Sequence, residues 1–137
     1  MKAVKSFKVF GEPIDILVSS ERTGGKSCTL LQTSQPGGGP PPHSHANEDE
    51  TFFVLEGEFE ILADGAWHKI APGEAAHGAR GATHTFRNIG KTDGKILIFV
   101  SPGGFDQYLE EISVLSVPKD MPQVLAISER YGVKFAL

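Results

Sequence analysis

The sequence predicts a small all-β barrel followed by a short helical tail. Sixteen glycines and nine prolines are spread along its 137 residues, where they separate short apolar or alternating segments. Such spacing is typical of β-sandwiches and barrels. The length is near the commonest size for one domain, and no linker or repeat divides the chain. We therefore expect one domain over residues 1–137, with a barrel core at about 14–100 and a C-terminal extension at 105–137.

Eight strands are expected in the barrel core, each bounded by turn residues. They are Ile14–Val18, Cys28–Ser34, Glu50–Leu55, Glu58–Leu62, Ala66–Ile70, Glu74–Gly78, His84–Asn88 and Lys95–Val100. Glu56-Gly57 and Asp64-Gly65 supply tight hairpin turns in this series, because glycine adopts a positive φ without a Cβ clash. The three strands joined by these turns are therefore expected to form a meander.

The segment before the first histidine is expected to be extended and stiff. All seven residues from Pro36 to Pro42 are glycine or proline. Proline fixes its own φ and pushes the preceding residue toward extended conformations. The segment therefore delivers His43 to the barrel in an extended approach.

Two short helices are expected in the C-terminal extension. The first candidate is Phe105–Ile112, and the second is Met121–Tyr131. Asp120 precedes the second helix as an N-cap, and Pro122 lies in its first turn, where proline is tolerated. Gly132 follows it as a C-terminal stop.

Composition argues against several classes of partner and location. The net charge is −4 with no basic cluster, so we expect no nucleic-acid partner, because such binding rests on Lys and Arg neutralising phosphates. The longest apolar runs, such as Ile96–Val100, are far shorter than the ~20 residues that span a bilayer. Glu12, Pro13 and Asp15 interrupt any secretory signal, which makes a cytoplasmic location the expectation. Cys28 is the only cysteine and is interpreted as a buried structural thiol.

Two of the five histidines, His43 and His45, are separated by one residue. In an extended strand, side chains at i and i+2 point to the same face, so both imidazoles can meet one ion. This pair alone is a weak indication of a metal site.

Longer motifs around this pair carry a resemblance to a known family. The first cupin motif, G-x5-H-x-H-x4-E-x6-G, is matched by Gly37, His43, His45, Glu50 and Gly57. The second, G-x5-P-x-G-x2-H-x3-N, is matched by Gly73, Gly81, His84 and Asn88, with Ala79 in place of its proline. The chain thus resembles the cupin family. The resemblance implies a double-stranded β-helix, or jelly-roll, barrel.

The resemblance also implies a metal-ligand set, which is His43, His45, Glu50 and His84. Three neutral imidazoles and one carboxylate suit Fe(II), Mn(II), Ni(II), Cu(II) or Zn(II), so we expect one divalent transition metal. Four protein ligands on a six-coordinate ion leave two positions for other molecules, as in catalytic sites.

The identity of the carboxylate ligand depends on the local strand geometry. Strict alternation from His45 would aim Asp49 toward the ion, so Glu50 requires a bend between the two. Glu48 and Asp49 are chemically adequate alternatives. The family spacing selects Glu50.

Four further residues are candidates for contact with a substrate. Alternation places Phe52 on the face of Glu50, and Phe86 on the face of His84, where they form either cavity wall or plain core. His77 and Arg80 lie in a stretch of alanines and glycines. His77 is interpreted as a base near the ion or as a solvated histidine, and Arg80 as a partner for a carboxylate or as a surface residue. The small residues of this stretch predict a wider cavity, or an opening, on the side of the barrel beside His84.

The expected function follows from the resemblance, which is greatest to small cupins of the quercetin 2,3-dioxygenase type. It implies a metal-dependent oxidoreductase in which an anionic enol or phenol substrate meets the ion. Glu50 is then a catalytic candidate, because a ligating carboxylate can also accept the substrate proton. One alternative is a metal-assisted isomerase, epimerase or lyase acting on a sugar or keto acid. The other alternative is a non-catalytic module that binds a small ligand.

A homodimer is also expected. The strand containing Phe53 and Leu55 is apolar on both faces, as is Ile96–Val100. A strand covered on one side only alternates with polar residues. Either the C-terminal helix or a second subunit must therefore cover the second face, and homodimers are frequent in the family that the chain resembles.

Overall fold

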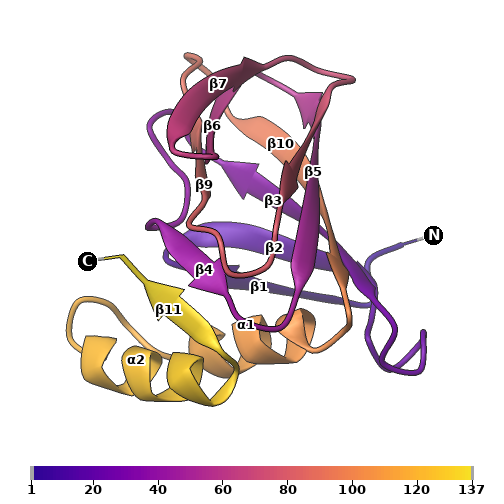
Figure 1. Ribbon diagram of the computed structural model, residues 1–137, viewed down its shortest axis with the longest axis vertical. Helices are drawn as coiled ribbons and strands as arrows, with labels where there is room; N and C mark the ends of the chain where they lie inside the picture. Colours follow the sequence, from indigo (N-terminus) through magenta and orange to yellow (C-terminus); the bar gives the residue numbers. More distant parts are fainter. Residues whose placement is uncertain (1, 137) are drawn as a thin grey trace.

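A computed structural model describes residues 2–136 as two facing antiparallel sheets that close into a barrel, with two helices at one end (Figure 1). The larger sheet has the order β1-β2-β3-β10-β5-β8, the smaller has the order β7-β6-β9, and β11 pairs with β4. The strands are β1 (Lys5–Val9), β2 (Glu12–Val18), β3 (Cys28–Ser34), β4 (His43–His45), β5 (Asp49–Glu56), β6 (Phe59–Ala63), β7 (Ala66–Ile70), β8 (Ala75–Gly78), β9 (Thr85–Asn88), β10 (Gly94–Ser101) and β11 (Val133–Phe135).

The core lies between the sheets, and strict alternation in the central strands builds it. Every second residue of β3 and of β10 is buried. Ile98 on β10 is paired with Leu30 on one side and with Phe52 on the other, and all three side chains are at most 3% exposed. This apolar layer closes the barrel behind the histidines. It also buries Cys28, whose expected place in the core is confirmed.

All eight expected strands are present, and each bound lies within two residues of its predicted position. The predicted hairpin turns are confirmed: Gly57 has a φ of 91°, while Asp64 and Gly65 have φ of 53° and 76°. Three further strands were not predicted. β4 and β11 have only three residues each, and β1 carries a mixed apolar and polar pattern.

The helices close one end of the barrel. α1 (Phe105–Ser113) turns its apolar face, which includes Phe105, Tyr108 and Leu109, toward the barrel interior. α2 (Met121–Arg130) has Tyr131 as its C-cap, and Gly132 follows with a φ of 74°, which confirms the predicted stop. Asp120 is the N-cap of α2, but its side chain does not cap the helix as expected, because its carboxylate accepts a hydrogen bond from the Ser116 N–H instead.

The outer face of the larger sheet is not covered by these helices. Leu55 and Phe99 remain 47% and 44% exposed on β5 and β10, because α1 packs against β1 and β3 at the end of the barrel instead. Of the two coverings expected for this face, the helix is therefore excluded, and the second subunit stays a prediction. None of the described helices is long and apolar enough to cross a membrane.

Candidate metal centre

Two of the four predicted ligands come from β4, and the proline run places them. His43 and His45 are buried at 8% and 0% exposure, while Ser44 between them faces the other way. The His43 Nδ1–H donates to the Pro41 carbonyl oxygen over 2.8 Å. This bond fixes the tautomer of His43 and leaves Nε2 as the free lone pair, as is typical of a metal-ligating histidine.

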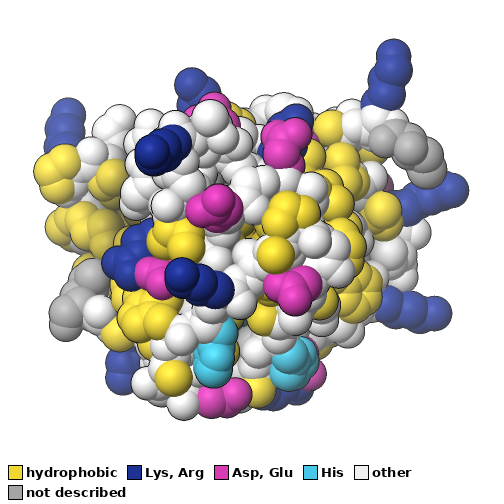
Figure 2. Space-filling view, turned by 90° about the horizontal axis from the view of Figure 1, so that it is seen from above, with side chains coloured by type: hydrophobic (Ala, Val, Ile, Leu, Met, Phe, Trp, Pro, Cys, Tyr) yellow, Lys and Arg dark blue, Asp and Glu magenta, His cyan; other side chains and the backbone are white. Residues whose placement is uncertain are grey.

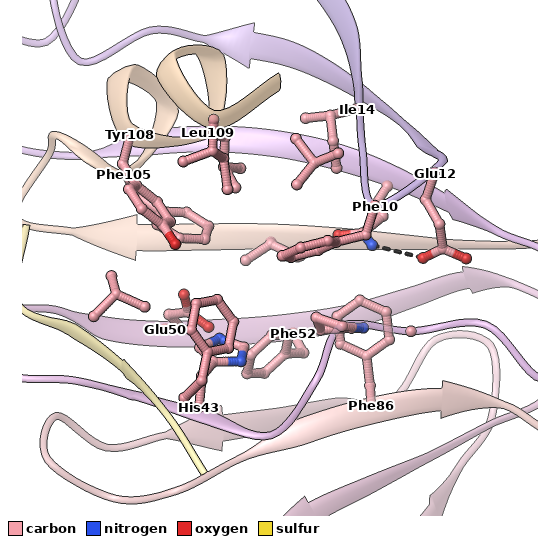
Figure 3. Close-up of a pocket in the computed structure, with 18 residues that line it drawn as sticks. Phe10, Glu12, Ile14, His43, Glu50, Phe52, Phe86, Phe105, Tyr108 and Leu109 are labelled. Carbon is pink, nitrogen blue, oxygen red and sulfur yellow. Dashed lines mark hydrogen bonds between the residues drawn. The ribbon is translucent and has the colours of Figure 1, made fainter. Parts of the chain in front are cut away.

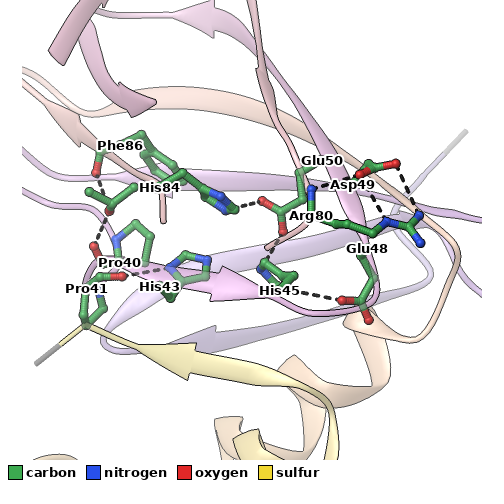
Figure 4. Close-up of polar contacts among 11 residues, drawn as sticks. Pro40, Pro41, His43, His45, Glu48, Asp49, Glu50, Arg80, His84 and Phe86 are labelled. Atoms are coloured by element: carbon green, nitrogen blue, oxygen red, sulfur yellow. Dashed lines mark hydrogen bonds and ion pairs between the residues drawn. The ribbon is translucent and has the colours of Figure 1, made fainter. Parts of the chain in front are cut away.

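The bend that Glu50 requires is present. The chain bends at Ala46 and Asn47 between β4 and β5, so Glu50 turns inward and is 2% exposed. Asp49 points outward, where its carboxylate accepts hydrogen bonds from the backbone N–H and the side chain of Arg80 (Figure 4). The geometry therefore places Glu50 in the cluster and excludes Asp49 from it.

His84 joins the cluster through the backbone. Its N–H donates to the His43 carbonyl over 2.8 Å, and the His43 N–H donates to the His84 carbonyl over 3.1 Å. The preceding loop is attached to β4 by a bond of 2.7 Å from the Gly81 N–H to the His45 carbonyl. This pairing brings the second motif against the first.

The four side chains converge on one point. His43, His45, Glu50 and His84 each offer a ligand atom, and these atoms all lie within 4.8 Å of one another. Glu50 Oε1 lies 3.0 Å from His45 Nε2, and Glu50 Oε2 lies 3.0 Å from His84 Nε2 (Figure 4).

These atoms are better suited to bind a shared cation than to form hydrogen bonds with one another. His45 Nε2, His84 Nε2 and Glu50 Oε1, which face the centre of the cluster, are buried without a partner in hydrogen-bond geometry among the described residues. Buried polar atoms are normally paired. Three imidazoles and a carboxylate around one point are a donor set for a divalent transition metal, and the cluster could hold such an ion.

Electrostatics favours a positive charge at the centre of the cluster. Burial lowers the pKa of His43 to about 4, which keeps this imidazole neutral. Burial also opposes the charge on His45, but Glu48 and Glu50 outweigh it and raise the pKa of His45 to about 9. The pKa of Glu50 lies below its usual range despite burial, because His45 and His84 stabilise the carboxylate.

Glu48 lies behind His45 rather than in the cluster. Its Oε2 is 3.3 Å from His45 Nδ1, and the residue is only 7% exposed. A carboxylate at the far nitrogen of a ligating histidine orients the ring and raises its basicity. Of the three acidic residues considered from the sequence, Glu48 thus occupies the position that supports a ligand.

A cavity of about 50 Å³ lies beside the cluster, inside the barrel (Figure 3). His43 and Glu50 border it, and so do Phe52 and Phe86, which were predicted to face inward. Other walls were missed by sequence reasoning, because they come from the β1–β2 turn, α1 and β11: Phe10, Phe105, Tyr108 and Phe135. The apolar face predicted for the first helix is the one sequence signal that could have indicated part of this wall.

The structure does not bring His77 and Arg80 to the cavity. His77 lies on the outer face of the edge strand β8 and is exposed, and Arg80 is exposed beside Asp49. Strand alternation explains the position of His77, because its neighbour Gly78 takes the inward place. Histidine side chains do reach the surface at the barrel end opposite the helices (Figure 2), where His68 and His77 border a surface hollow of about 400 Å³.

The space predicted beside His84 is not found at Gly78, although Ala75, Ala76 and Ala79 of the same stretch line the surface hollow of about 400 Å³. A Cβ on Gly78 would lie 3.1 Å from His84 Nδ1 and 3.1 Å from a ring carbon of Phe52. The missing side chain therefore allows two rings to pack onto the strand, and it leaves no void. Asn88 of the second motif is structural, because its amide donates to the Ser34 and Thr92 carbonyls.

Comparisons with known proteins agree with this geometry. The family model described as cupin domain matches residues 30–100. An uncharacterized protein of Aquifex aeolicus (strain VF5) is 38% identical over 58 residues, which are 42% of this chain and 48% of that protein. The match thus spans about half the length of this curated relative.

Solved structures show the same fold. A predicted oxalate decarboxylase from Thermotoga maritima superposes with a TM-score of 0.64 at 25% identity, over 66% of this chain and 80% of that chain. KdgF from Halomonas sp. superposes with a TM-score of 0.67 at 18% identity, over 78% of this chain and 97% of that chain. The second likeness concerns the fold alone.

Proposed function

The chain belongs to the cupin domain family, and on this premise we propose that it is a metal-dependent enzyme acting on a small, largely apolar molecule. The observation that carries the proposal is the position of the buried cluster. His43 and Glu50 form part of the wall of the internal cavity. A ligand in that cavity therefore meets the point on which the imidazoles and the carboxylate converge.

Different residues of the chain have different roles in this proposal. His43, His45, Glu50 and His84 hold one divalent transition metal, which supplies Lewis acidity and, with oxygen, redox chemistry. Glu50 also accepts a proton from the substrate, because its carboxylate lies at the cavity wall. The aromatic walls exclude water, which strengthens electrostatic interactions inside the cavity.

The cavity wall favours a dioxygenase-type reaction on an enol or phenol. Phe52, Phe86 and Phe105 give the cavity an apolar surface, and no lysine or arginine is among the described residues that line it. A sugar phosphate would need cationic partners for its phosphate, whereas a small enolate with an apolar body needs only the ion and the apolar wall. The cavity is small, about 50 Å³, which favours a compact substrate.

A non-oxidative reaction is the second candidate. The solved cupin at 25% identity is named as a predicted oxalate decarboxylase, and a metal-assisted lyase or isomerase would polarise a keto acid at the same cluster without consuming oxygen. A module that binds a small ligand without turnover is the third.

Oxygen uptake separates these candidates. The protein is loaded in turn with Fe(II), Mn(II), Ni(II), Cu(II) and Zn(II) and mixed with small phenols, enols and 2-oxo acids. The dioxygenase proposal predicts uptake with at least one redox-active metal and none with Zn(II). Product formed equally without oxygen would favour the non-oxidative reaction, and ligand binding without product would favour the module.

A matched pair of variants controls this assay. His84→Gln removes a predicted ligand and should abolish uptake, whereas His68→Gln changes an exposed histidine on β7 and should leave it unchanged. Equal activity in both variants would contradict the proposed metal centre.

A further inference from the structure

The mouth of the internal cavity can be located from the exposure of its wall. Of the described residues that line the cavity, all are buried except Phe10, Gly39, Pro40 and Phe135, which are half-buried. A cavity opens toward solvent where its wall residues are themselves exposed. These four residues therefore mark the mouth, and the proposed metal centre does not use them.

One side of the mouth is held by backbone contacts. A Cβ on Gly39 would overlap the Phe86 carbonyl oxygen, so this glycine lies directly against β9. The Pro40 carbonyl oxygen accepts a hydrogen bond from the hydroxyl of Thr85, which is also on β9. Proline restricts the backbone further, because its ring fixes φ. This side of the mouth is therefore a fixed edge.

Two aromatic rings form the other side of the mouth. Phe10 lies in the turn between β1 and β2, Phe135 lies on β11, and their ring centroids are 6.0 Å apart in an edge-to-face contact. Phenylalanine has no hydrogen-bonding group, so apolar contacts alone hold the two rings, and each ring can leave its place by a change of rotamer. The Phe135 ring is also 6.1 Å from the His43 ring. The movable side of the mouth thus lies next to a predicted metal ligand.

Space for such movement lies outside Phe10. A second surface hollow, of about 410 Å³, lies between the β1–β2 turn and the two helices. Val9, Phe10 and Ile112 line both this hollow and the cavity, and of these three only Phe10 is not buried. Figure 3 shows Phe10 beside Glu12, on the side of the cavity away from Phe105. The hollow therefore provides the volume that a turning Phe10 ring needs.

We propose that Phe10 and Phe135 form a gate at the mouth of the cavity and determine the size of the ligand that enters. The inference rests on the proposed function, which places the ligand at His43 and Glu50. While the two rings are in contact, only a compact ligand passes between them and the fixed edge. A ligand with a larger body must first separate the rings, so the gate selects ligands by size before they reach the ion.

Two metal-binding probes of different size test the gate without knowledge of the natural substrate. Azide is small and linear, whereas 4-phenylimidazole carries a bulky ring, and both bind a metal through a nitrogen lone pair. The visible absorption spectrum of the Co(II)-loaded protein reports ligand binding at the ion. Stopped-flow mixing then gives the association rate constant of each probe.

Removing either ring should open the mouth to the bulky probe. In Phe10→Ala and in Phe135→Ala, the association rate constant of 4-phenylimidazole should rise at least ~10-fold, while that of azide should rise less than ~3-fold, because azide needs less space to pass. Phe10→Leu and Phe135→Leu should give smaller increases of the same kind. These leucine variants replace any alanine variant that thermal unfolding shows to be unfolded.

Phe7→Ala is the matched control. Phe7 lies on β1 and packs half-buried against the core, but it is not among the described residues that line the cavity. Its replacement removes a ring of the same size from the strand that leads to Phe10. Both association rate constants should therefore stay within ~3-fold of the wild-type values.

The outcomes separate the gate from the metal centre. A 4-phenylimidazole rate constant that keeps its wild-type value in the folded gate variants, or that rises as much in Phe7→Ala, overturns the gate and leaves the proposed function intact. Equal increases for both probes overturn the selection by size. If Co(II) binds but its spectrum responds to neither probe in any variant, no ligand reaches the ion; the proposed function then fails, and the inference fails with it.

Discussion

Replacing Gly78 by alanine tests how closely the second motif is packed. The φ of Gly78 is not positive, so alanine fits the backbone and by itself would stabilise the protein by about 0.4–1 kcal/mol. Its Cβ, however, would lie 3.1 Å from both His84 and Phe52, and overpacking of this kind costs about 1–3 kcal/mol. The overpacking term is the larger, so Gly78→Ala should lower the free energy of unfolding by about 1 kcal/mol.

The same substitution should weaken metal binding. In the metal-free protein the His84 ring relieves part of the clash by turning, whereas a bound ion holds the ring in place. Strain of about 1.4 kcal/mol retained in the metal-bound form lowers the affinity about tenfold.

Chemical denaturation and a chelator competition measure the two effects. Ala75→Ser, at an exposed position on the same strand, is the control and should change either quantity little, because exposed substitutions usually stay within about 0.5 kcal/mol. A Gly78→Ala protein as stable as this control, with unchanged metal affinity, would refute the packing argument.

Three further predictions concern other parts of the molecule. Glu48→Ala should lower metal affinity about 10–100-fold through loss of the carboxylate behind His45, while Asp49→Ala should change it little; equal effects in a chelator competition would contradict the assigned roles. Burial raises the pKa of Cys28 from 9.0 to about 12, so thiol alkylation of the native protein should stay slow from pH 7 to 9. Because the unfolded thiol ionises first, stability measured by denaturation should decline between about pH 9 and 12, and a rise would contradict this. Light scattering of the wild-type protein should give a mass of twice the 14.7 kDa of one chain. The Phe99→Lys variant, changed on the exposed sheet face, should give the mass of a single chain. A wild-type monomer would exclude the proposed dimer.

The barrel strands and the ligand cluster could be predicted because short-range rules determine them. Glycine at positive φ marks the hairpins, as at Gly57 and Gly65, and period-two burial follows from the pleat of each strand. The spacing of His43 and His45 likewise needs only one extended strand. The bend before Glu50 was the one local feature that alternation could not supply.

The cavity wall could not be predicted, because it depends on packing between segments distant in the chain. Phe10 and Phe135 lie at opposite ends of the sequence, yet their rings meet edge to face at 6.0 Å between centroids. β11 brings Phe135 opposite His43. A strand of three residues is too short for its sequence pattern to predict that pairing. The small side chain of Gly78 was interpreted as unfilled space, whereas two rings from other strands fill that space.

The metal content of the purified protein tests the central claim most directly. Elemental analysis after loading and desalting should find about one equivalent of a divalent transition metal in the wild-type protein, as expected for a four-ligand site. A folded Glu50→Gln variant should retain far less. A wild-type protein without bound metal, or a variant that retains as much as the wild type, would contradict the assignment of His43, His45, Glu50 and His84 as a metal centre.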